Sequence, residues 1–334
     1  VMLEHGGNLI KAVDDYGIAL AEWLDLSTGI NPNGWPVPTA IPSECWSQLP
    51  NDNDGLLAAA QRYYQTESLL PVSGSQAAIQ MLPQLRAKCR VGIITPAYAE
   101  HFYSWQRAGH EVIELHSDEI DARIDLLDVL IIINPNNPTA EQFTNEQLLH
   151  WHQQLAHHDG WLIVDEAFID TTPELSLTQF SPQPGLIIFR SLGKFFGLAG
   201  LRVGFVCAET KLLSLLQNRL GPWQISGPSR YIARLALADS DWQQQCQYNL
   251  IEQSQRLKQL LIDAGLPPTN GCALFQWVPT EHAYDYQHAL SKLGILTRRF
   301  NSPPSLRFGL AKTEHDWQRL ESGLASLKVE HHDR

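Results

Sequence analysis

The sequence predicts an α/β protein, with a mostly parallel central sheet in one large domain and an additional, smaller α+β domain. The chain has 334 residues, which is too long for one small core and suits a large domain with a smaller companion. Short apolar runs, glycine-rich turns and helical patterns alternate through its middle, as they do in parallel sheets covered by helices. A long amphipathic stretch at 241–264 then precedes strand-like runs at 271–278 and 305–310, which we assign to the smaller domain.

The individual elements follow from the spacing of apolar residues. The run at 129–133 consists of valine, leucine and isoleucines and is typical of a buried strand. A short strand is expected to enter a helix at 71–78. Further strands are expected at 23–27, from 91, and at 111–115, 161–168 and 186–189, and helices from 9 into the mid-teens and at 56–64, 211–220, 229–237, 241–264 and 316–327.

Composition and charge exclude several classes of function. The net charge of −12 disfavours binding to nucleic acid and to anionic lipid. Five scattered cysteines without a CxxC pair argue against a disulfide framework or a zinc site, and favour a reducing cytoplasm. We expect no signal peptide, because no basic segment precedes a long apolar one. No apolar run approaches the ~20 residues of a membrane span.

Residues 191–204 surround one lysine with glycines and aromatic side chains. A desolvated lysine loses part of its preference for the ammonium form, so the amine of Lys194 can attack a carbonyl. Ser191 lies three residues before Lys194, and Arg202 lies eight residues after it. A hydroxyl and a guanidinium that flank a reactive amine suit a phosphorylated aldehyde. The alternative interpretation is a solvated lysine in a glycine-rich loop.

Two further segments offer polar groups to such a ligand. Gly74 and Ser75 begin a predicted helix, whose N–H groups and positive dipole end favour a phosphate. The alternative for Ser75 is an ordinary N-cap. Asp165 ends an apolar run, and open α/β sheets bind ligands at the carboxyl ends of their strands. The alternative for Asp165 is a cap on the following turn.

These segments together resemble the fold-type I pyridoxal-phosphate (PLP) enzymes, the aspartate aminotransferase superfamily, over essentially the whole chain. The resemblance implies a fold-type I PLP-dependent transferase in which Lys194 carries the cofactor aldehyde and Asp165 keeps the pyridine nitrogen protonated. It places Tyr98 on the ring face, and it places Asn137, from an Asn-Pro-x-Asn-Pro-Thr pattern, at the phenolate oxygen. The residues implied near the cofactor phosphate are Gly74, Ser75, Gln76, Ser191 and Arg202. Lys194 and Asp165 are the implied catalytic residues, and no metal is implied.

The resemblance also divides the chain and implies a homodimer, because the superfamily builds its sites at a dimer interface. Residues 1–27 are expected to pack with the small domain and the active site. Residues 28–225 are expected to form the large PLP-binding domain, and residues 226–334 the small C-terminal domain.

The opening His5-Gly6-Gly7-Asn8, the loop at 26–32 and the run Asp165-Glu166-Ala167-Phe168-Ile169-Asp170 are similar to the threonine-phosphate decarboxylase family of cobalamin biosynthesis. In that family the first two segments lie near the substrate phosphate, which implies His5, Gly6 and Asn31 here. Asn31 could instead cap its turn. Arg307 lies in an apolar strand, where a cation is costly unless it meets an anion, and the superfamily uses the matching arginine to bind the substrate carboxylate. A structural salt bridge is the alternative.

The implied reaction converts L-threonine O-3-phosphate to (R)-1-aminopropan-2-yl phosphate and CO₂. Three positions depart from the wider superfamily. Phe168 stands where aminotransferases commonly have a tyrosine that donates to the cofactor oxygen. Leu49 replaces a tyrosine that reaches the neighbouring subunit's cofactor phosphate, and Ala140 replaces a glycine. The sequence does not decide whether Arg298 or Arg299 faces the site.

Two other functions are considered. A histidinol-phosphate-type aminotransferase shares the fold, the cofactor and a phosphorylated amino substrate, but it fits better with tyrosine at position 168. A non-catalytic regulator of the same fold would bind DNA through an additional N-terminal helix-turn-helix domain. The acidic charge and the opening at His5-Gly6-Gly7-Asn8 disfavour such a regulator.

Overall fold

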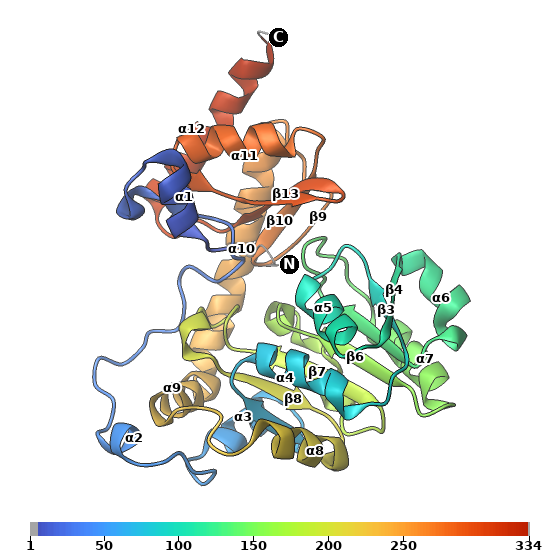
Figure 1. Ribbon diagram of the computed structural model, residues 1–334. Helices are drawn as coiled ribbons and strands as arrows, with labels where there is room; N and C mark the ends of the chain where they lie inside the picture. The colour runs from blue at the N-terminus through green and yellow to red at the C-terminus, as the bar shows by residue number, and fades with distance from the viewer. Residues whose placement is uncertain (1–5, 333–334) are drawn as a thin grey trace. The chain divides into compact units, whose positions relative to one another are not determined.

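A seven-stranded sheet organises residues 34–137 and 142–245, the larger of two units into which the chain divides. The computed structural model describes residues 6–332 (Figure 1). The strand order is β2–β8–β7–β6–β5–β3–β4, in which only β8 runs antiparallel to its neighbours. The strands are β2 Leu69–Val72, β3 Arg90–Ile94, β4 Glu111–Leu115, β5 Val129–Ile133, β6 Trp161–Asp165, β7 Leu186–Ser191 and β8 Gly204–Cys207. The expected mostly parallel sheet is confirmed.

The helices of this unit follow the strands as the alternating pattern predicts. They are α2 Glu44–Ser47, α3 Leu56–Tyr64, α4 Ser75–Met81, α5 Ala99–Arg107, α6 Ile120–Arg123, α7 Asn145–Ala156, α8 Thr210–Leu220 and α9 Gly227–Ala238. The start of α7 illustrates the local cause, since the Thr144 hydroxyl accepts from the Gln147 N–H while the Gln147 side chain accepts from the Thr144 N–H. This capping box satisfies two backbone donors that a helix start otherwise leaves unpaired.

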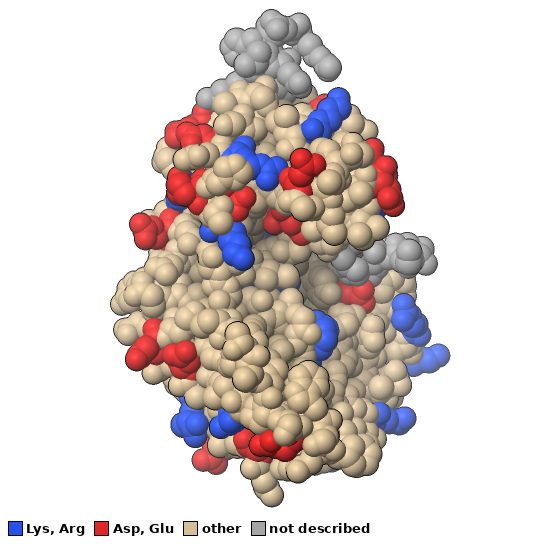
Figure 2. Space-filling model, turned by 90° about the vertical axis from the view of Figure 1, so that its left-hand side faces the viewer, with Lys and Arg blue, Asp and Glu red and all other residues tan. Residues whose placement is uncertain are grey.

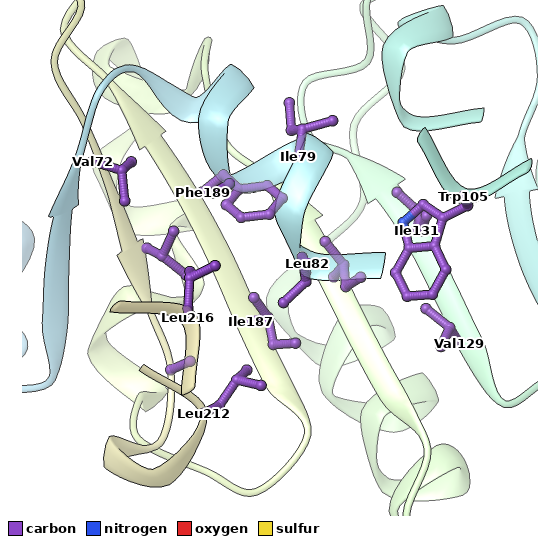
Figure 3. Packing of buried hydrophobic residues seen from close by; sticks show 14 of the residues in the cluster. Val72, Ile79, Leu82, Trp105, Val129, Ile131, Ile187, Phe189, Leu212 and Leu216 are labelled. Atoms are coloured by element: carbon purple, nitrogen blue, oxygen red, sulfur yellow. The ribbon is translucent and has the colours of Figure 1, made fainter. Parts of the chain in front are cut away.

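One face of the sheet packs against α4, α5 and α8. Ile187 and Phe189 project from β7 towards Ile79 and Leu82, as Figure 3 shows, and all four side chains are buried. Because side chains alternate across a strand, Arg190 must project to the opposite face. The β-branched run of β5 is buried throughout, as expected for a strand covered on both faces.

The smaller unit comprises residues up to 33, residues 138–141 and residues from 246. Its main sheet is antiparallel, with the order β12–β13–β10–β9, and β1 pairs separately with β11 in parallel. Its elements are α1 Leu9–Tyr16, β1 Leu24–Asp25, β9 Asn270–Cys272, β10 Phe275–Pro279, α11 Ala283–Lys292, β11 Ile295–Leu296, β12 Arg298–Asn301, β13 Pro304–Gly309 and α12 Glu314–His332. The long helix α10, Ser240–Asp263, contributes residues to both units.

Two sequence expectations need correction. The run at 271–278 is a hairpin rather than one strand, because Cys272 pairs with Phe275 across a turn at Ala273 and Leu274. The strand expected at 161–168 ends at Asp165, where the Ala167 N–H donates to the Asp165 carboxylate and the chain turns. The domain division at 27 and 225 stays a prediction.

The surface carries both signs of charge. On the face shown in Figure 2, basic and acidic side chains of the described residues are intermingled, and neither sign forms a continuous patch. Between residues 6 and 332 we find no helix with both the length and the apolar character to cross a membrane. The same part of the chain contains no group of three or more His, Cys, Asp or Glu side chains that could hold a metal ion.

Candidate active site

The carboxyl ends of β5, β6 and β7 meet at one edge of the larger sheet. Ile133 pairs with Asp165, and Asp165 pairs with Phe189, so the three strands end in register. Asn137 follows β5, Asp165 is the last residue of β6, and Ser191 is the last residue of β7, three positions before Lys194. Parallel pairing therefore gathers four of the residues expected at the cofactor along one edge, where open α/β sheets bind ligands.

Asp165 is buried, with 4% of its surface exposed, and its carboxylate is held by a histidine. The Nε2 atom of His101 lies 2.9 Å from Oδ2 of Asp165. A carboxylate accepts only, so this nitrogen donates. His101 is itself buried and stacks on Phe189, with ring centroids 5.9 Å apart. The Asp165 side chain is thus fixed at the strand end by α5, which carries His101.

Tyr98 precedes α5 and lies edge-on to His101, with ring centroids 6.2 Å apart. Its hydroxyl donates to Oε1 of Gln76 at 3.2 Å, and Nε2 of Gln76 donates to Glu100 at 2.7 Å. Burial and then the Glu100 carboxylate raise the pKa of Tyr98 to about 12, so the phenol is neutral at physiological pH. The Gln76 side chain therefore joins α4 to α5, which leaves only its backbone N–H for a ligand at the start of α4.

Gly74 and Arg202 are brought into direct contact. A Cβ atom at Gly74 would lie 2.7 Å from Nη2 of Arg202, and Gly74 has a φ of +72°. Arg202 is also left-handed, at φ 54°, and its Nη1 donates to the Ala199 carbonyl at 3.3 Å. A guanidinium at a side-chain-free helix start forms a cradle for an anion. This cradle fits the phosphate group of PLP.

The Lys194 amine faces an aromatic ring. Its Nζ atom lies 5.4 Å from the centroid of the buried Phe168 ring. In the turn before Lys194, the Ser191 hydroxyl accepts from the Gly193 N–H at 3.1 Å. The expected residues Gly74, Ser75, Gln76, Tyr98, Asn137, Asp165, Ser191, Lys194 and Arg202 all belong to the larger unit.

We predict that Gly74→Ala weakens cofactor binding. The added methyl group would lie 2.7 Å from Nη2 of Arg202, so the guanidinium would have to move, and alanine would be forced into a positive φ. Together these effects should raise the Kd for PLP by about 10-fold or more. Fluorescence titration of the cofactor-free protein measures this change. Gly200→Ala is the control, because a Cβ at Gly200 meets nothing within 4 Å. An unchanged Kd for Gly74→Ala would contradict the role of this cradle.

In the smaller unit, Gly6 and Arg307 meet at the same serine. The Gly7 N–H donates to Oγ of Ser27 at 2.7 Å, and a Cβ at Gly6 would lie 2.3 Å from the Ser27 carbonyl oxygen. That carbonyl accepts from Nη2 of Arg307 at 2.6 Å. Ser27 is held in turn by Asp25, whose Oδ1 accepts from the Ser27 hydroxyl at 2.6 Å. The expected residue His5 lies outside the described residues.

Burial and then the Arg298 guanidinium lower the pKa of Arg307 to about 10, so Arg307 remains cationic at neutral pH. Arg298 and Arg307 are directly paired across β12 and β13. Arg299, one position along, lies against the ring of Tyr284 at 4.9 Å. The guanidinium of Arg298 therefore acts electrostatically on that of Arg307.

Asn31 is buried, and its side chain has structural contacts. Its Oδ1 accepts from the Asn33 N–H at 2.9 Å, and its Nδ2 donates to Sγ of Cys246 at 3.2 Å. The contact with the Asn33 N–H is the one expected if Asn31 caps its turn. A substrate contact of Asn31 stays a prediction.

The structure shows the surroundings of the three residues that differ from the superfamily pattern, Ala140, Leu49 and Phe168. Ala140 has a φ of +55°, a conformation that glycine adopts at lower cost, which accounts for the usual glycine. Leu49 is 66% exposed. Phe168 lies beside Lys194 but offers no hydroxyl to donate.

The sequence profile of the Aminotransferase class I and II family matches residues 49–323. The chain therefore belongs to that family, as the resemblance implied. A solved histidinol-phosphate aminotransferase from Sinorhizobium meliloti, in complex with pyridoxal-5'-phosphate, has the same fold. Its TM-score is 0.80, at 19% identity, with 97% of this chain and 98% of that chain covered.

Within this family the chain is a member of the threonine-phosphate decarboxylases. It is 49% identical to a threonine-phosphate decarboxylase of Pseudomonas aeruginosa, over 99% of this chain and 100% of the relative. A threonine-phosphate decarboxylase of Sinorhizobium sp is 39% identical over 97% of this chain and 98% of the relative. By contrast, a histidinol-phosphate aminotransferase of Sodalis glossinidius is 32% identical over only 56% of this chain and 55% of the relative.

The sequence analysis missed His101. It lies three residues after Tyr98, in the first turn of the helix that begins at Ala99. That spacing was the available signal.

Proposed function

We propose that the protein binds PLP and decarboxylates L-threonine O-3-phosphate to (R)-1-aminopropan-2-yl phosphate, in cobalamin biosynthesis. The observation that carries the proposal is the carboxyl edge of two neighbouring parallel strands. Asp165, which is held by His101, ends β6, and Lys194 follows β7. The 49% identity to a threonine-phosphate decarboxylase over the whole chain supports the choice of substrate.

In this proposal the residues of the larger unit hold the cofactor. Lys194 would bond to its aldehyde, Asp165 would accept from its protonated pyridine nitrogen, and Tyr98 would pack on its ring. Asn137 would donate to its phenolate oxygen. The phosphate would be bound at the start of α4 by the backbone of Gly74, Ser75 and Gln76, and by the side chains of Ser191 and Arg202. When bound, PLP supplies an electron sink for the bond that breaks at the substrate Cα.

The substrate residues belong to the smaller unit in this proposal. Arg307 would bind the carboxylate of the substrate as a planar bidentate donor, and Gly6, His5 and Asn31 would lie near the substrate phosphate. Arg298 contributes a second positive charge next to Arg307. Two neighbouring guanidinium groups match a substrate that carries two anionic groups.

Arg307 donates to the Ser27 carbonyl, which holds its guanidinium in place. A substrate bound by this guanidinium would therefore be held in one orientation. Anchoring of the substrate phosphate decides whether the bond from Cα to the carboxylate, rather than the bond to hydrogen, is presented for cleavage. That bond breaks, CO₂ leaves, and Cα receives a proton. The Nζ atom of Lys194, or a water molecule, returns this proton. Phe168 packs beside the amine and limits the water around it.

A product assay tests the proposal. PLP-loaded protein is incubated with L-threonine O-3-phosphate, with and without 2-oxoglutarate, while CO₂ and aminopropanol phosphate are measured. We expect CO₂ without any keto acid. Absence of CO₂, together with glutamate formed from 2-oxoglutarate and histidinol phosphate, would reassign the protein as an aminotransferase. Phe168 favours the decarboxylase, because that position lacks the tyrosine common in aminotransferases.

We further propose that the protein acts as a homodimer in the cytoplasm, where its five free cysteines would stay reduced. The larger unit exposes Trp46, Leu49 and Trp223 by 68%, 66% and 59%. Figure 1 places α2, which carries Trp46, next to α9, and Cys45 contacts Gly227 at the start of α9. Large apolar side chains that are this exposed are candidates for an interaction surface.

We predict that Trp46→Glu converts the dimer to a monomer, because it places a charge in an apolar interface. Sedimentation velocity measures the change in mass. Leu126→Glu serves as the control, since Leu126 is also exposed but lies at a distant position of the sequence, after α6. A wild-type protein that sediments as a monomer at all concentrations would refute the proposed dimer.

A further inference from the structure

We infer that Arg190 is a positioning residue, which holds both ends of the turn 166–170 so that its middle residue, Phe168, packs against the Lys194 amine. This inference rests on the proposed function, because the Lys194 amine matters as the group that bonds to PLP. Arg190 itself touches neither the substrate nor the cofactor in this scheme. Its side chain projects from β7 on the face of the sheet opposite to that of Phe189.

Two carboxylates hold the Arg190 guanidinium. Its Nη1 lies 3.0 Å from Oε2 of Glu166, and its Nη2 lies 2.6 Å from Oδ1 of Asp170. All three side chains are buried, with at most 3% exposed. Arg190 thus joins the first residue of the turn to its last residue. An arginine suits this task, because its planar fork presents several donors in fixed directions.

Each carboxylate is held by further donors. Glu166 accepts from the Ser176 hydroxyl at 2.6 Å and from the Leu177 N–H at 2.7 Å. Asp170 accepts from the Tyr63 hydroxyl at 2.8 Å. Burial alone would lower the pKa of Arg190, but the Asp170 and Glu166 carboxylates raise it above its ordinary value, so the guanidinium stays charged. A buried cluster with this many partners fixes one arrangement of the turn.

The turn leads directly to the candidate active site. Glu166 follows Asp165, and its N–H donates to the Phe189 carbonyl at 3.0 Å, so the cluster begins where the pairing of β6 and β7 ends. Phe168, midway between the two carboxylates, lies with its ring centroid 5.4 Å from Nζ of Lys194. Arg190 is also four residues before Lys194 along the chain. Both routes, through the turn and through β7, connect Arg190 to the lysine.

A purely structural role for Arg190 makes a different prediction. Loss of a buried charge contact would lower thermal stability but would leave the folded fraction with an unchanged active site. The positioning role requires that the surroundings of Lys194 change in protein that remains folded. Visible circular dichroism of bound PLP reports on these surroundings, because the cofactor gains its signal from a fixed, asymmetric environment.

The test compares Arg190→Lys with Arg230→Lys in the PLP-loaded protein. Lysine keeps the charge at position 190 but cannot bridge two carboxylates with a fork. Arg230 is a matched control, since it is also buried and binds Asp54 through Nε at 2.5 Å and Nη2 at 3.0 Å. We expect both variants to lower Tm by several degrees. Only Arg190→Lys should reduce the visible dichroism and lower kcat, by about 10- to 100-fold.

Phe168→Leu tests the route through the turn 166–170 without any change in β7. It also tests the inference if Arg190→Lys fails to fold. It should reproduce the loss of visible dichroism with Arg190 intact. In a folded double variant, the two losses should be less than additive, because both changes act on one contact. Unchanged dichroism and kcat in folded Arg190→Lys, or wild-type dichroism in Phe168→Leu, would overturn the inference. Failure of the wild-type protein to bind PLP would instead refute the proposed function.

Discussion

Lys194→Ala is expected to reduce decarboxylation of L-threonine O-3-phosphate by at least about 10³-fold, the scale of loss when a covalent catalytic group is removed. In the proposed function, alanine would supply neither the amine that bonds to the cofactor nor the group that returns a proton to Cα. The measurement is the steady-state rate of CO₂ release, with an absorbance spectrum to follow the cofactor. We expect the long-wavelength absorbance of lysine-bound PLP to be lost.

The control for this variant is Lys211→Ala. Lys211 is an exposed lysine of α8, and its loss removes the same charge without touching the sheet edge. It should retain the wild-type rate and spectrum. Full turnover by Lys194→Ala would refute the mechanism, whatever the substrate.

Asp165→Asn is expected to have the second-largest effect, a loss of about 10²- to 10³-fold in kcat, comparable to the removal of one preorganised electrostatic group. Asparagine is nearly isosteric and can still accept from Nε2 of His101. It lacks the negative charge that, in the proposed function, would keep the pyridine nitrogen protonated. Single-turnover measurement of CO₂ release tests the chemical step directly.

His101→Phe distinguishes the charge of Asp165 from its orientation. This variant keeps an aromatic ring at the stacking position against Phe189 but removes the donor to the carboxylate. We expect a smaller loss than for Asp165→Asn, because the charge remains. An equal or larger loss would mean that His101 contributes more than orientation.

The sequence was sufficient to predict the sheet edge, for a physical reason. Buried parallel strands read as continuous apolar runs, and each polar residue that ends such a run must lie at the carboxyl edge. Asp165 could be assigned in this way without coordinates. Lys194 was inferred from its glycine-rich and aromatic surroundings, and Asn137 from the resemblance to the superfamily.

The partners across the sheet could not be predicted in this way. His101 meets Asp165 across 64 positions of sequence, and Tyr63 meets Asp170 across 107. No local pattern specifies which distant polar group satisfies a buried carboxylate. The motif that includes Glu166 and Asp170 supported the family resemblance, yet its role in binding Arg190 required the structure. The sequence allowed Asn31 to be either a substrate residue or a turn cap. The contacts seen in the structure are those of a turn cap.

The division of residues between the two units has a consequence for protein engineering. Every residue assigned to the cofactor belongs to residues 34–137 and 142–245, whereas Gly6, Asn31 and Arg307 belong to the other unit. On the proposed assignment, a library restricted to the smaller unit would vary the substrate residues while the residues assigned to the cofactor stay unchanged.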